Sequence, residues 1–311
     1  MLACDGIHLH TLTTRRPEEA LVVRVLRPTT LDEALAVLRH SDEDTKVVAG
    51  GTALMLMMRT GLLFPDTLVS LEDIAGLDYI NIDEREVRLG GLTTLRTMER
   101  SKDLSAVLPT LTQALPLVAN HRVRNRATIG GNLCEADYAS DPPSILVTLD
   151  CQVRLRSTRG DRLVPLREFL VDYYETTIEH DELAVEVIIP RPDAGTRTHY
   201  VKYVSRTSED RPCVGVAASL QVIDGTCRAV NVQVAGATST PFSVPRALAD
   251  CVGQAPTDDL WAHVAHAFET EIEPIDDVRG SSAYRRQVTG RLVKRTLRGL
   301  TQNHPNGATR L

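Results

Sequence analysis

Three pairs of adjacent glycines, each placed where a short strand is expected to end, constrain the fold of this chain more than any other sequence feature. They are evenly spaced along the chain, at Gly50–Gly51, Gly90–Gly91 and Gly130–Gly131. Their flanking sequences differ, so the even spacing does not indicate a repeat. Glycine lets the backbone turn sharply and leaves amide N–H groups exposed. Each pair is therefore either a tight turn without a ligand or a nest of amides that binds an anion.

The flanks of two pairs favour the anion-binding interpretation. In VVAGGTALM a helix is expected directly after Gly51, where a helix N-terminus attracts phosphate, and Thr52 adds a hydroxyl. In TIGGN the glycines lie between Thr128 and Asn132, whose side chains form hydrogen bonds. The pair Gly90–Gly91 lacks such flanks and is interpreted as structural. Neither loop matches G-x-G-x-x-G or the P-loop pattern, which argues against the Rossmann and P-loop folds.

Charged side chains surround the third pair. Three arginines alternate on a segment expected to be a strand and a loop: Arg122, Arg124 and Arg126. Their guanidinium groups are expected either to bind phosphate or to lie in a salt-bridged surface or a subunit contact. Asp141 precedes two prolines and is expected to cap the helix that follows, with Pro142 in its first turn. Glu135 and Asp137 are interpreted as solvated acids of the loop.

Hydrophobic periodicity divides the chain into two kinds of structure. Up to about residue 175 short strands alternate with helices, one of which begins with a capping box of Thr30 and Glu33. Beyond it, ELAVEVIIP, THYVKYVSR, CVGVAASLQVI and CRAVNVQVAGA are expected to form an antiparallel sheet with one buried face, followed by helices. The pattern predicts an α+β chain with four segments: an N-terminal extension (1–24), an α/β region (25–175), a second domain (176–300) and a flexible tail (301–311).

Composition excludes several classes of function. The net charge of −6 and the absence of a basic tract argue against a nucleic-acid-binding protein. The six cysteines form no Cys-x-x-Cys or Cys/His cluster, so no zinc or iron–sulfur site is expected in this chain. The longest apolar run, ALMLMM, is too short to span a bilayer, and the N-terminus lacks the apolar core of a signal peptide. We therefore expect a cytoplasmic protein with reduced thiols and no membrane insertion.

Taken together, VVAGGTALM and RNRATIGGNLCEADYASDPP resemble the FAD-binding (medium) subunits of molybdenum hydroxylases, the family of xanthine dehydrogenase and carbon monoxide dehydrogenase. The resemblance continues through LGGLTTLRTME and reappears at DDVRGSSAYRRQVTGRLVKRTL, so it covers about residues 25–300. It implies an FAD-binding domain of the p-cresol methylhydroxylase/vanillyl-alcohol oxidase type, with two α/β subdomains, over residues 25–175. Over residues 176–300 it implies a CO dehydrogenase flavoprotein C-terminal domain, an antiparallel sheet with helices.

The resemblance also implies which residues hold FAD. The first glycine loop wraps the pyrophosphate, the loop at Gly130–Gly131 holds it from the other side, Asp141 binds hydroxyls on the flavin side, and Lys202 lies near the flavin. The implied cofactor-binding residues are Ala49, Gly50, Gly51, Thr52, Ala53, Leu54, Thr128, Ile129, Gly130, Gly131, Asn132, Asp141 and Lys202. From the residues alone, Asp141 remains open as a plain helix N-cap and Lys202 as an ordinary surface lysine.

The chain departs from the family pattern at two informative positions. Thr52 stands where some relatives carry a histidine, so FAD is expected to be bound non-covalently. Tyr138 stands where relatives usually have proline, which can reshape the loop near the flavin.

The function implied is that of the FAD-carrying electron-transfer subunit of a heteromeric molybdenum hydroxylase acting on an N-heterocycle, purine, aldehyde, ketone or CO. A large partner would carry molybdopterin and a small partner the [2Fe–2S] clusters, in a dimer of heterotrimers. No residue here is expected to act on the organic substrate or to bind a metal. Two alternatives stay open: a stand-alone FAD oxidase of the same fold, and a non-catalytic assembly subunit that has lost FAD.

Overall fold

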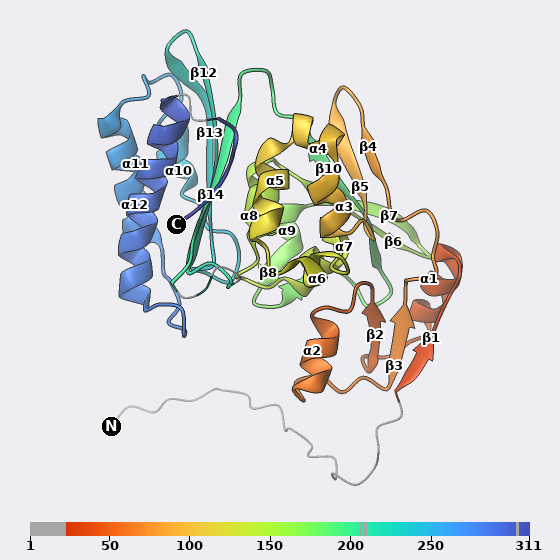
Figure 1. Ribbon diagram of the computed structural model, residues 1–311. Helices are drawn as coiled ribbons and strands as arrows, with labels where there is room; N and C mark the ends of the chain where they lie inside the picture. Colours follow the sequence, from red (N-terminus) through yellow and green to blue (C-terminus); the bar gives the residue numbers. More distant parts are fainter. Residues whose placement is uncertain (1–22, 206, 208–209, 303–304) are drawn as a thin grey trace, which may run out of the picture.

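The computed structural model describes residues 23–205, 207, 210–302 and 305–311. Figure 1 shows three parts packed in a row: a small sheet with its helices, a central sheet wrapped by helices, and a C-terminal sheet with a helical layer. This is the mixed architecture of helices and sheets that the sequence predicts. The expected N-terminal extension, residues 1–24, lies outside the described residues apart from Val23 and Arg24.

The first part is a parallel three-stranded sheet in the order β1–β3–β2, with one helix packed on it. Its elements are β1 (Arg24–Leu26), α1 (Leu31–Arg39), β2 (Thr45–Val48), α2 (Leu54–Arg59) and β3 (Thr67–Ser70). The predicted capping box starts α1, since Thr30 Oγ1 accepts from the Glu33 amide at 3.2 Å. The Glu33 carboxylate accepts from the backbone of Thr29, one residue earlier than the motif predicts. Helix α1 buries Ala34, Leu35 and Leu38.

Helix α2 differs from α1 because none of its residues is buried, although five of the six are Leu or Met. Its C-terminus is closed by Gly61. Gly61 adopts a φ of +73°, its amide donates to the carbonyl of Met58 at 3.1 Å, and the amide of Leu62 donates to that of Met57 at 2.9 Å. These two bonds form a Schellman motif, so α2 is a well-terminated helix that leaves an apolar surface exposed.

The central sheet is antiparallel, in the order β4–β5–β10–β6–β7. Its strands are β4 (Ile80–Ile82), β5 (Glu86–Gly90), β6 (Gln152–Ser157), β7 (Gly160–Pro165) and β10 (Leu183–Pro190). The hairpin of β6 and β7 turns at Thr158 and Arg159. Strand β10, however, corresponds to ELAVEVIIP, which the sequence analysis placed in the C-terminal sheet. That placement is wrong, because β10 is the middle strand of the central sheet, between β5 and β6.

Short helices and a two-stranded ribbon surround the central sheet. They are α3 (Leu95–Arg100), α4 (Lys102–Val107), α5 (Pro109–Ala114), η1 (Leu115–Leu117), α6 (His121–Arg124), α7 (Ile129–Glu135), α8 (Asp141–Thr148), α9 (Leu166–Phe169), β8 (Leu170–Asp172) and β9 (Glu175–Thr176). All eight residues of α8 are buried, because this helix lies between the central core and the C-terminal sheet. Two expectations fail here: the segment of the three arginines contains α6, and RATIGGN contains the start of α7, where a strand and a loop were predicted.

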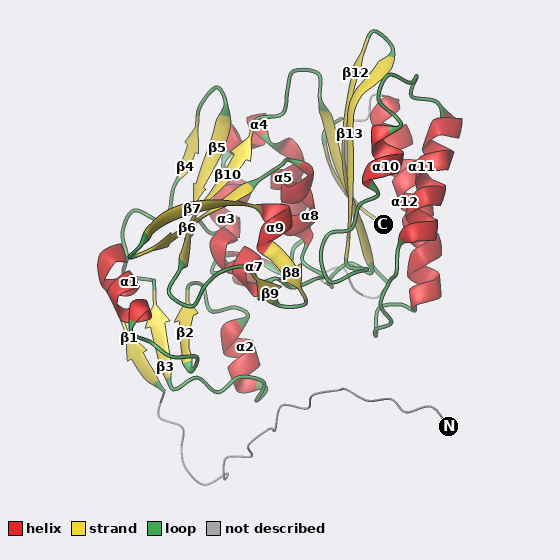
Figure 2. Cartoon of the chain, turned by 180° about the vertical axis from the view of Figure 1, so that it is seen from behind, coloured by secondary structure: helices red, strands yellow, loops and turns green. Residues whose placement is uncertain are grey.

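The C-terminal sheet has the order β13–β12–β11–β14. Its elements are β11 (Arg197–Tyr203), β12 (Val214–Ile223), β13 (Thr226–Ala235), α10 (Pro245–Ala249), α11 (Asp258–Glu271), α12 (Ser282–Thr301) and β14 (Gly307–Arg310). Val216 and Leu220 on one face pack with Trp261 and Phe268 of the outer helices. The other face contacts α5 and α8. The expectation of a single buried face is therefore wrong, since this sheet is buried on both sides (Figure 2).

The tail also differs from expectation. Residues 307–310, within the segment predicted to be flexible, form β14, which pairs in parallel with β11 from His199↔Gly307 to Lys202↔Arg310. The chain end thereby protects the edge of the C-terminal sheet, where unpaired backbone groups would otherwise be exposed.

Close backbone contacts explain two of the glycine pairs. The amide of Gly130 donates to the carbonyl of Gly91 at 3.0 Å, and the amide of Gly91 donates to Val185 in β10 at 2.8 Å. A methyl group built on Gly130 would lie 2.6 Å from the Gly91 oxygen, and one built on Gly91 would lie 2.2 Å from the Ala184 oxygen. Side chains are excluded at both positions, so Gly90–Gly91 is structural, as the sequence indicated.

This contact predicts different costs for two adjacent glycines. Gly130→Ala should lower the free energy of unfolding by about 3 kcal/mol, because the new methyl group meets fixed backbone. Gly131→Ala meets only the hydroxyl of Thr128, at 2.8 Å, and should cost about 1 kcal/mol through the weakened helix cap. Urea unfolding of both variants measures this difference. Equal costs, or a larger cost at Gly131, would contradict the packing explanation.

Candidate cofactor-binding site

The first glycine loop connects β2 to α2 and turns at Gly51, whose φ of +71° lies in the left-handed region that favours glycine. Gly50 packs directly on backbone: a methyl group built on it would lie 1.8 Å from the carbonyl oxygen of Arg126. Arg126 precedes the second loop by two residues. The two loops of the predicted site are therefore held together by a contact that admits no side chain.

The first loop presents a run of free amide donors. Among the described residues, no hydrogen bond is donated by the backbone amides of Gly50, Gly51, Thr52, Ala53 and Leu54. All five residues are only partly buried. Consecutive unpaired amides at a sharp turn before a helix form an anion-binding nest. The loop therefore leaves main-chain donors without partners in the described residues, and their use for a phosphate group stays a prediction.

The second loop differs from the prediction. Thr128 is the N-cap of α7, and its Oγ1 accepts from the Gly131 amide at 3.1 Å. The amide of Ile129 donates to Thr93, that of Gly130 to Gly91, and that of Asn132 to the Thr128 carbonyl. These amides are already used by the fold, so the expected second nest of free donors is not formed. The reason is that the segment is a capped helix packed against β5 and not a strand followed by an open loop.

The second loop nevertheless borders the first. Gly131 is exposed, and a methyl group built on it would lie 3.8 Å from the Cβ of Ala49. The Asn132 side chain exchanges hydrogen bonds with the Ser140 hydroxyl at 2.9 and 3.1 Å. Ser140, which the sequence analysis did not single out, is the N-cap of α8 and precedes Asp141.

Asp141 and Lys202 are brought together in the interior. Lys202 Nζ donates to Asp141 Oδ2 at 2.8 Å and to the carbonyl of Leu117 at 2.7 Å. Tyr200 donates to the other carboxylate oxygen at 2.5 Å. Asp141 is 3% exposed and Lys202 1%. Asp141 is thus the first residue of α8 and not its N-cap, and the alternative that Lys202 is a surface lysine is wrong.

This buried group links the central part to the C-terminal sheet, because Asp141 lies on α8 while Tyr200 and Lys202 lie on β11. Burial raises the pKa of Asp141 above its usual value, while Lys202 and Tyr200 act in the opposite direction. Burial and Asp141 raise the pKa of Tyr200 well above its usual value, so its hydroxyl remains a donor. The sequence signal for Tyr200 is its spacing, since residues two apart on a strand share a face.

A second link between the two parts involves Tyr138, the residue that replaces the family's proline. Its hydroxyl donates to Asp277 at 2.8 Å, and the Arg279 guanidinium lies 5.5 Å from the centre of its ring. Arg285, which is fully buried, donates to the same carboxylate. Burial opposes ionisation of Asp277, but hydrogen bonds from Arg285, the Arg279 backbone and Tyr138 lower its pKa to about 2. The motif near 277–285 therefore acts structurally.

The charged residues around the second loop are mostly paired. Arg124 is buried and donates to Glu99 at 2.9 Å, while Arg126 is exposed and lies 3.1 Å from Glu72. Asp137 is buried and paired with Arg211, so its interpretation as a solvated acid is wrong. Glu135 is partly buried, and burial together with Asp137 raises its pKa to about 7. No ion pair engages Arg122 among the residues that the structure describes.

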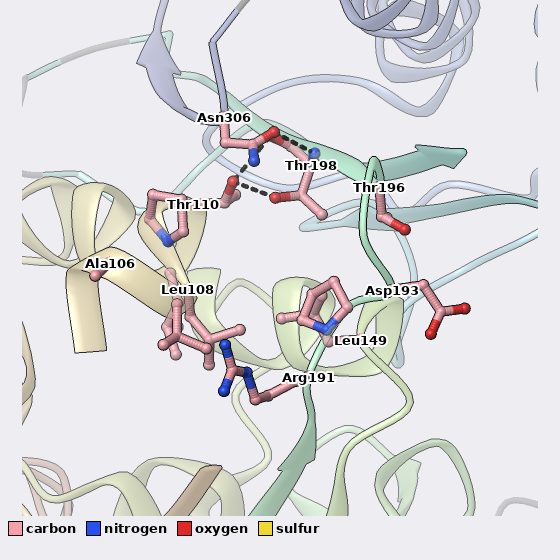
Figure 3. Close-up of a pocket in the computed structure, with 13 residues that line it drawn as sticks. Ala106, Leu108, Thr110, Leu149, Arg191, Asp193, Thr196, Thr198 and Asn306 are labelled. Atoms are coloured by element: carbon pink, nitrogen blue, oxygen red, sulfur yellow. Dashed lines mark hydrogen bonds between the residues drawn. The ribbon is translucent and has the colours of Figure 1, made fainter. Parts of the chain in front are cut away.

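A separate cavity of about 130 Å³ lies between the central part and the C-terminal sheet (Figure 3). Thr110 Oγ1 donates to the Thr198 carbonyl at 2.9 Å, and the Thr198 amide donates to Asn306 Oδ1 at 2.8 Å. Arg191 also lines the cavity, and it donates to the Asp83 carbonyl. None of the predicted cofactor-binding residues lines this cavity.

Other kinds of site find no support in the described part of the chain. No group of three or more His, Cys, Asp or Glu side chains there could hold a metal ion. No helix in the same residues has both the length and the apolar character needed to cross a membrane. The free amides of the first loop, by contrast, fit the charge and chemistry of a pyrophosphate, which is bound by uncharged donors as readily as by cations.

Comparison with known proteins assigns the family. Residues 21–192 match the FAD binding domain in molybdopterin dehydrogenase, and residues 199–300 match the CO dehydrogenase flavoprotein C-terminal domain. The chain belongs to the family of FAD-binding medium subunits of molybdenum hydroxylases. It is therefore a flavoprotein and an oxidoreductase component.

Individual relatives agree over nearly their whole length. The chain is 32% identical to the 6-hydroxypseudooxynicotine dehydrogenase complex subunit alpha of Paenarthrobacter nicotinovorans, covering 86% of this chain and 90% of the relative. A structure of reconstituted CO dehydrogenase from Oligotropha carboxidovorans superposes with a TM-score of 0.86 at 29% identity, covering 91% of this chain and 98% of that one. Quinoline 2-oxidoreductase from Pseudomonas putida 86 gives a TM-score of 0.84 at 27% identity, covering 90% and 97%.

Breaking the buried ion pair should be costly. Lys202→Met leaves the Asp141 carboxylate buried without its cation and should lower the free energy of unfolding by about 3–5 kcal/mol. Lys294→Met is the matched control, because Lys294 pairs with Asp258 at 2.9 Å on the surface and should cost less than about 1 kcal/mol. Urea unfolding measures both.

The same variant should acquire a pH dependence. Without Lys202, the folded-state pKa of Asp141 rises further. A carboxyl group whose folded-state pKa is raised contributes stability at low pH, and this contribution is lost as pH rises through that pKa. The Lys202→Met variant should therefore regain stability relative to the unsubstituted protein as pH falls through the raised pKa of Asp141. The double variant Asp141→Asn/Lys202→Met should not show this gain. A pH-independent deficit would contradict the assignment.

Proposed function

We propose that this chain is the FAD-carrying electron-transfer subunit of a heteromeric molybdenum hydroxylase, accepting electrons from a [2Fe–2S] partner and passing them to an external acceptor. Molybdopterin would be carried by a large partner and the iron–sulfur clusters by a small one, in a dimer of heterotrimers. The observation that carries the proposal is the run of five unpaired amides at residues 50–54, within a chain of the FAD-binding family.

In this proposal FAD binds non-covalently, and the residues of the chain position it. The amides of residues 50–54 hold the pyrophosphate without a positive side chain, and the Thr52 hydroxyl can add a further hydrogen bond. The exposed N-terminal turn of α7, at Gly131, would border the cofactor on its other side. Bound FAD supplies the redox chemistry, and the protein supplies orientation and electrostatics.

Asp141 and Lys202 take a different role from the one that the resemblance implied. Both are buried and mutually paired, so in this proposal they position the C-terminal domain against the second loop through Ser140 and Asn132. Direct contact of the Asp141 carboxylate with flavin hydroxyls would require its surroundings to open, because Asp141 is 3% exposed.

Two glycines test the proposed pyrophosphate loop. Gly51→Ala should reduce the FAD content of the purified protein about tenfold, because alanine disfavours the left-handed turn that aligns the amides. Gly61→Ala is the matched control: Gly61 has a φ of +73° at the other end of α2 but does not belong to the run of free amides. The visible flavin spectrum and the affinity for added FAD are the measurements.

The outcomes separate the alternatives. Loss of FAD in both variants, or in neither, would contradict the loop assignment. Oxidation of a small alcohol or amine by the isolated chain would favour a stand-alone oxidase. Absence of a flavin spectrum after reconstitution of the unsubstituted chain would favour an assembly subunit that has lost FAD.

An exposed apolar surface supports the proposed partners. The α2 surface, defined as Met55, Leu56, Leu62 and Phe64, follows the first loop, and its side chains are 48%, 56%, 78% and 58% exposed. Contiguous exposed apolar side chains mark protein interfaces. The position of this surface, next to the proposed cofactor loop, suits a subunit that exchanges electrons with FAD.

The five described cysteines are free thiols, which supports a cytoplasmic location.

The α2 surface predicts a selective assembly defect. When co-expressed with its partner subunits, Met55→Ser/Leu56→Ser should retain FAD but weaken association at least tenfold, because the apolar contact is lost. Ile223→Ser/Val252→Ser is the control, since these residues are similarly exposed, at 48% and 51%, on the C-terminal domain. Size-exclusion chromatography with flavin detection measures both. Normal assembly of the α2 variant would contradict the assignment of this surface.

A further inference from the structure

Helices α11 and α12 form the outer layer of the C-terminal domain (Figure 2). A groove between them is lined by residues of both helices and by none of the glycine loops. Its volume is about 410 Å³. Ala262, Ala265 and Gly290 give it a floor of small residues, and a methyl group built on Gly290 would lie 3.3 Å from the Ala265 carbonyl oxygen. The two helices therefore approach closely at Gly290 and leave a shallow apolar channel along their length.

The rim of this groove is strongly positive. Helix α12 contains six cationic residues and no Asp or Glu in its 20 residues. Two of the six are used within the fold: Arg285 pairs with Asp277, and Arg286 donates to the Ile272 carbonyl. The other four line the groove: Arg291, Lys294, Arg295 and Arg298.

These four cations repel one another. Their spacing of three, four and seven residues places them on one face of the helix, where like charges destabilise it. A solvated basic helix face normally intersperses acids that offset this repulsion. Here Asp258 of α11 lies 2.9 Å from Lys294 and 3.5 Å from Arg298. No ion partner in the described residues reaches Arg291 or Arg295, both of which are exposed.

The groove combines an apolar floor with four cations, of which Arg291 and Arg295 have no ion partner in the described residues, and one lining carboxylate, Glu269. A small anion would not use the apolar floor, and the lining offers no Phe, Tyr or Trp on which nucleic-acid bases could stack. The net charge of the whole chain is −6, so the positive groove is a local exception. An amphipathic helix lays its apolar side in such a groove and can place carboxylates opposite guanidinium groups, which they bind bidentately.

We propose that the groove between α11 and α12 is a docking site for an acidic, amphipathic segment of another protein. Carboxylates of that segment pair with Arg291 and Arg295, and its apolar side covers the floor around Ala265 and Gly290. Docking relieves the repulsion along α12. The site does not include the FAD-binding loops, so the docking proposal is tested separately from the proposed function.

The test uses the purified full-length protein and a synthetic helical peptide with leucines on one side and glutamates on the other. A peptide with lysine in place of each glutamate is the charge control. We expect the acidic peptide to bind by fluorescence anisotropy at least tenfold more tightly than the lysine peptide, with an affinity that falls as salt is added. Arg291→Glu/Arg295→Glu should weaken binding of the acidic peptide at least tenfold.

Matched variants keep the result interpretable. Arg228→Glu/Arg246→Glu changes the net charge equally at exposed arginines of β13 and α10, and it should bind as the unsubstituted protein does. Arg291→Gln/Arg295→Gln removes the charge without adding repulsion and should also lose binding while its circular dichroism spectrum is unchanged. Equal weakening by both charge-reversal pairs would overturn the proposal. So would tight binding to phosphatidylserine vesicles or a DNA oligonucleotide in place of the peptide.

Discussion

The candidate site depends on two backbone contacts that leave no room for a side chain. Gly50 rests on the carbonyl of Arg126, and Gly130 rests on Gly91 of the central sheet. Together they join three segments that are far apart in the sequence: the loop after β2, the end of β5 and the start of α7. Because the contacts are between backbone atoms, they position the first loop rigidly against the second. They thereby fix where the free amides of residues 50–54 lie.

Charged groups are paired in the interior, whereas two surfaces leave apolar or cationic side chains without partners in the described residues. The largely buried pair Asp141–Lys202 connects the central part to the C-terminal domain. The pair Asp277–Arg285 lies within the C-terminal domain, and Tyr138 of the central part donates to its carboxylate. Buried pairs of this kind specify one arrangement of two domains more than they stabilise the fold. The surfaces that leave apolar or cationic groups unpartnered, around α2 and between α11 and α12, lie on opposite parts of the molecule (Figure 1).

Much of this organisation follows from local sequence. The capping box at Thr30, the glycine at the end of α2, the hairpin at Gly160 and the amphipathic helices of the C-terminal domain each depend on side chains within a few residues of one another. Local patterns were insufficient where long-range packing decided the outcome. ELAVEVIIP is a strand by composition, but only the partners β5 and β6 place it in the central sheet. The pattern of RATIGGN predicts a strand followed by a loop. Its glycines instead begin helix α7, because Thr128 caps this helix and the Gly91 carbonyl accepts from the Gly130 amide.

The sequence by itself determined the family and the two glycine loops and predicted main-chain donors for a pyrophosphate, because these depend on residue types and their order. Only the tertiary structure decided which donors remain free. The amides of the second loop donate to Thr93, Gly91 and Thr128, whereas those of the first loop donate to no neighbour in the described part of the chain. It also decided that Asp141 and Lys202 form an interior pair. The physical reason is that hydrogen-bond satisfaction and burial are properties of the packed chain, and they depend on residues that the local sequence does not contain.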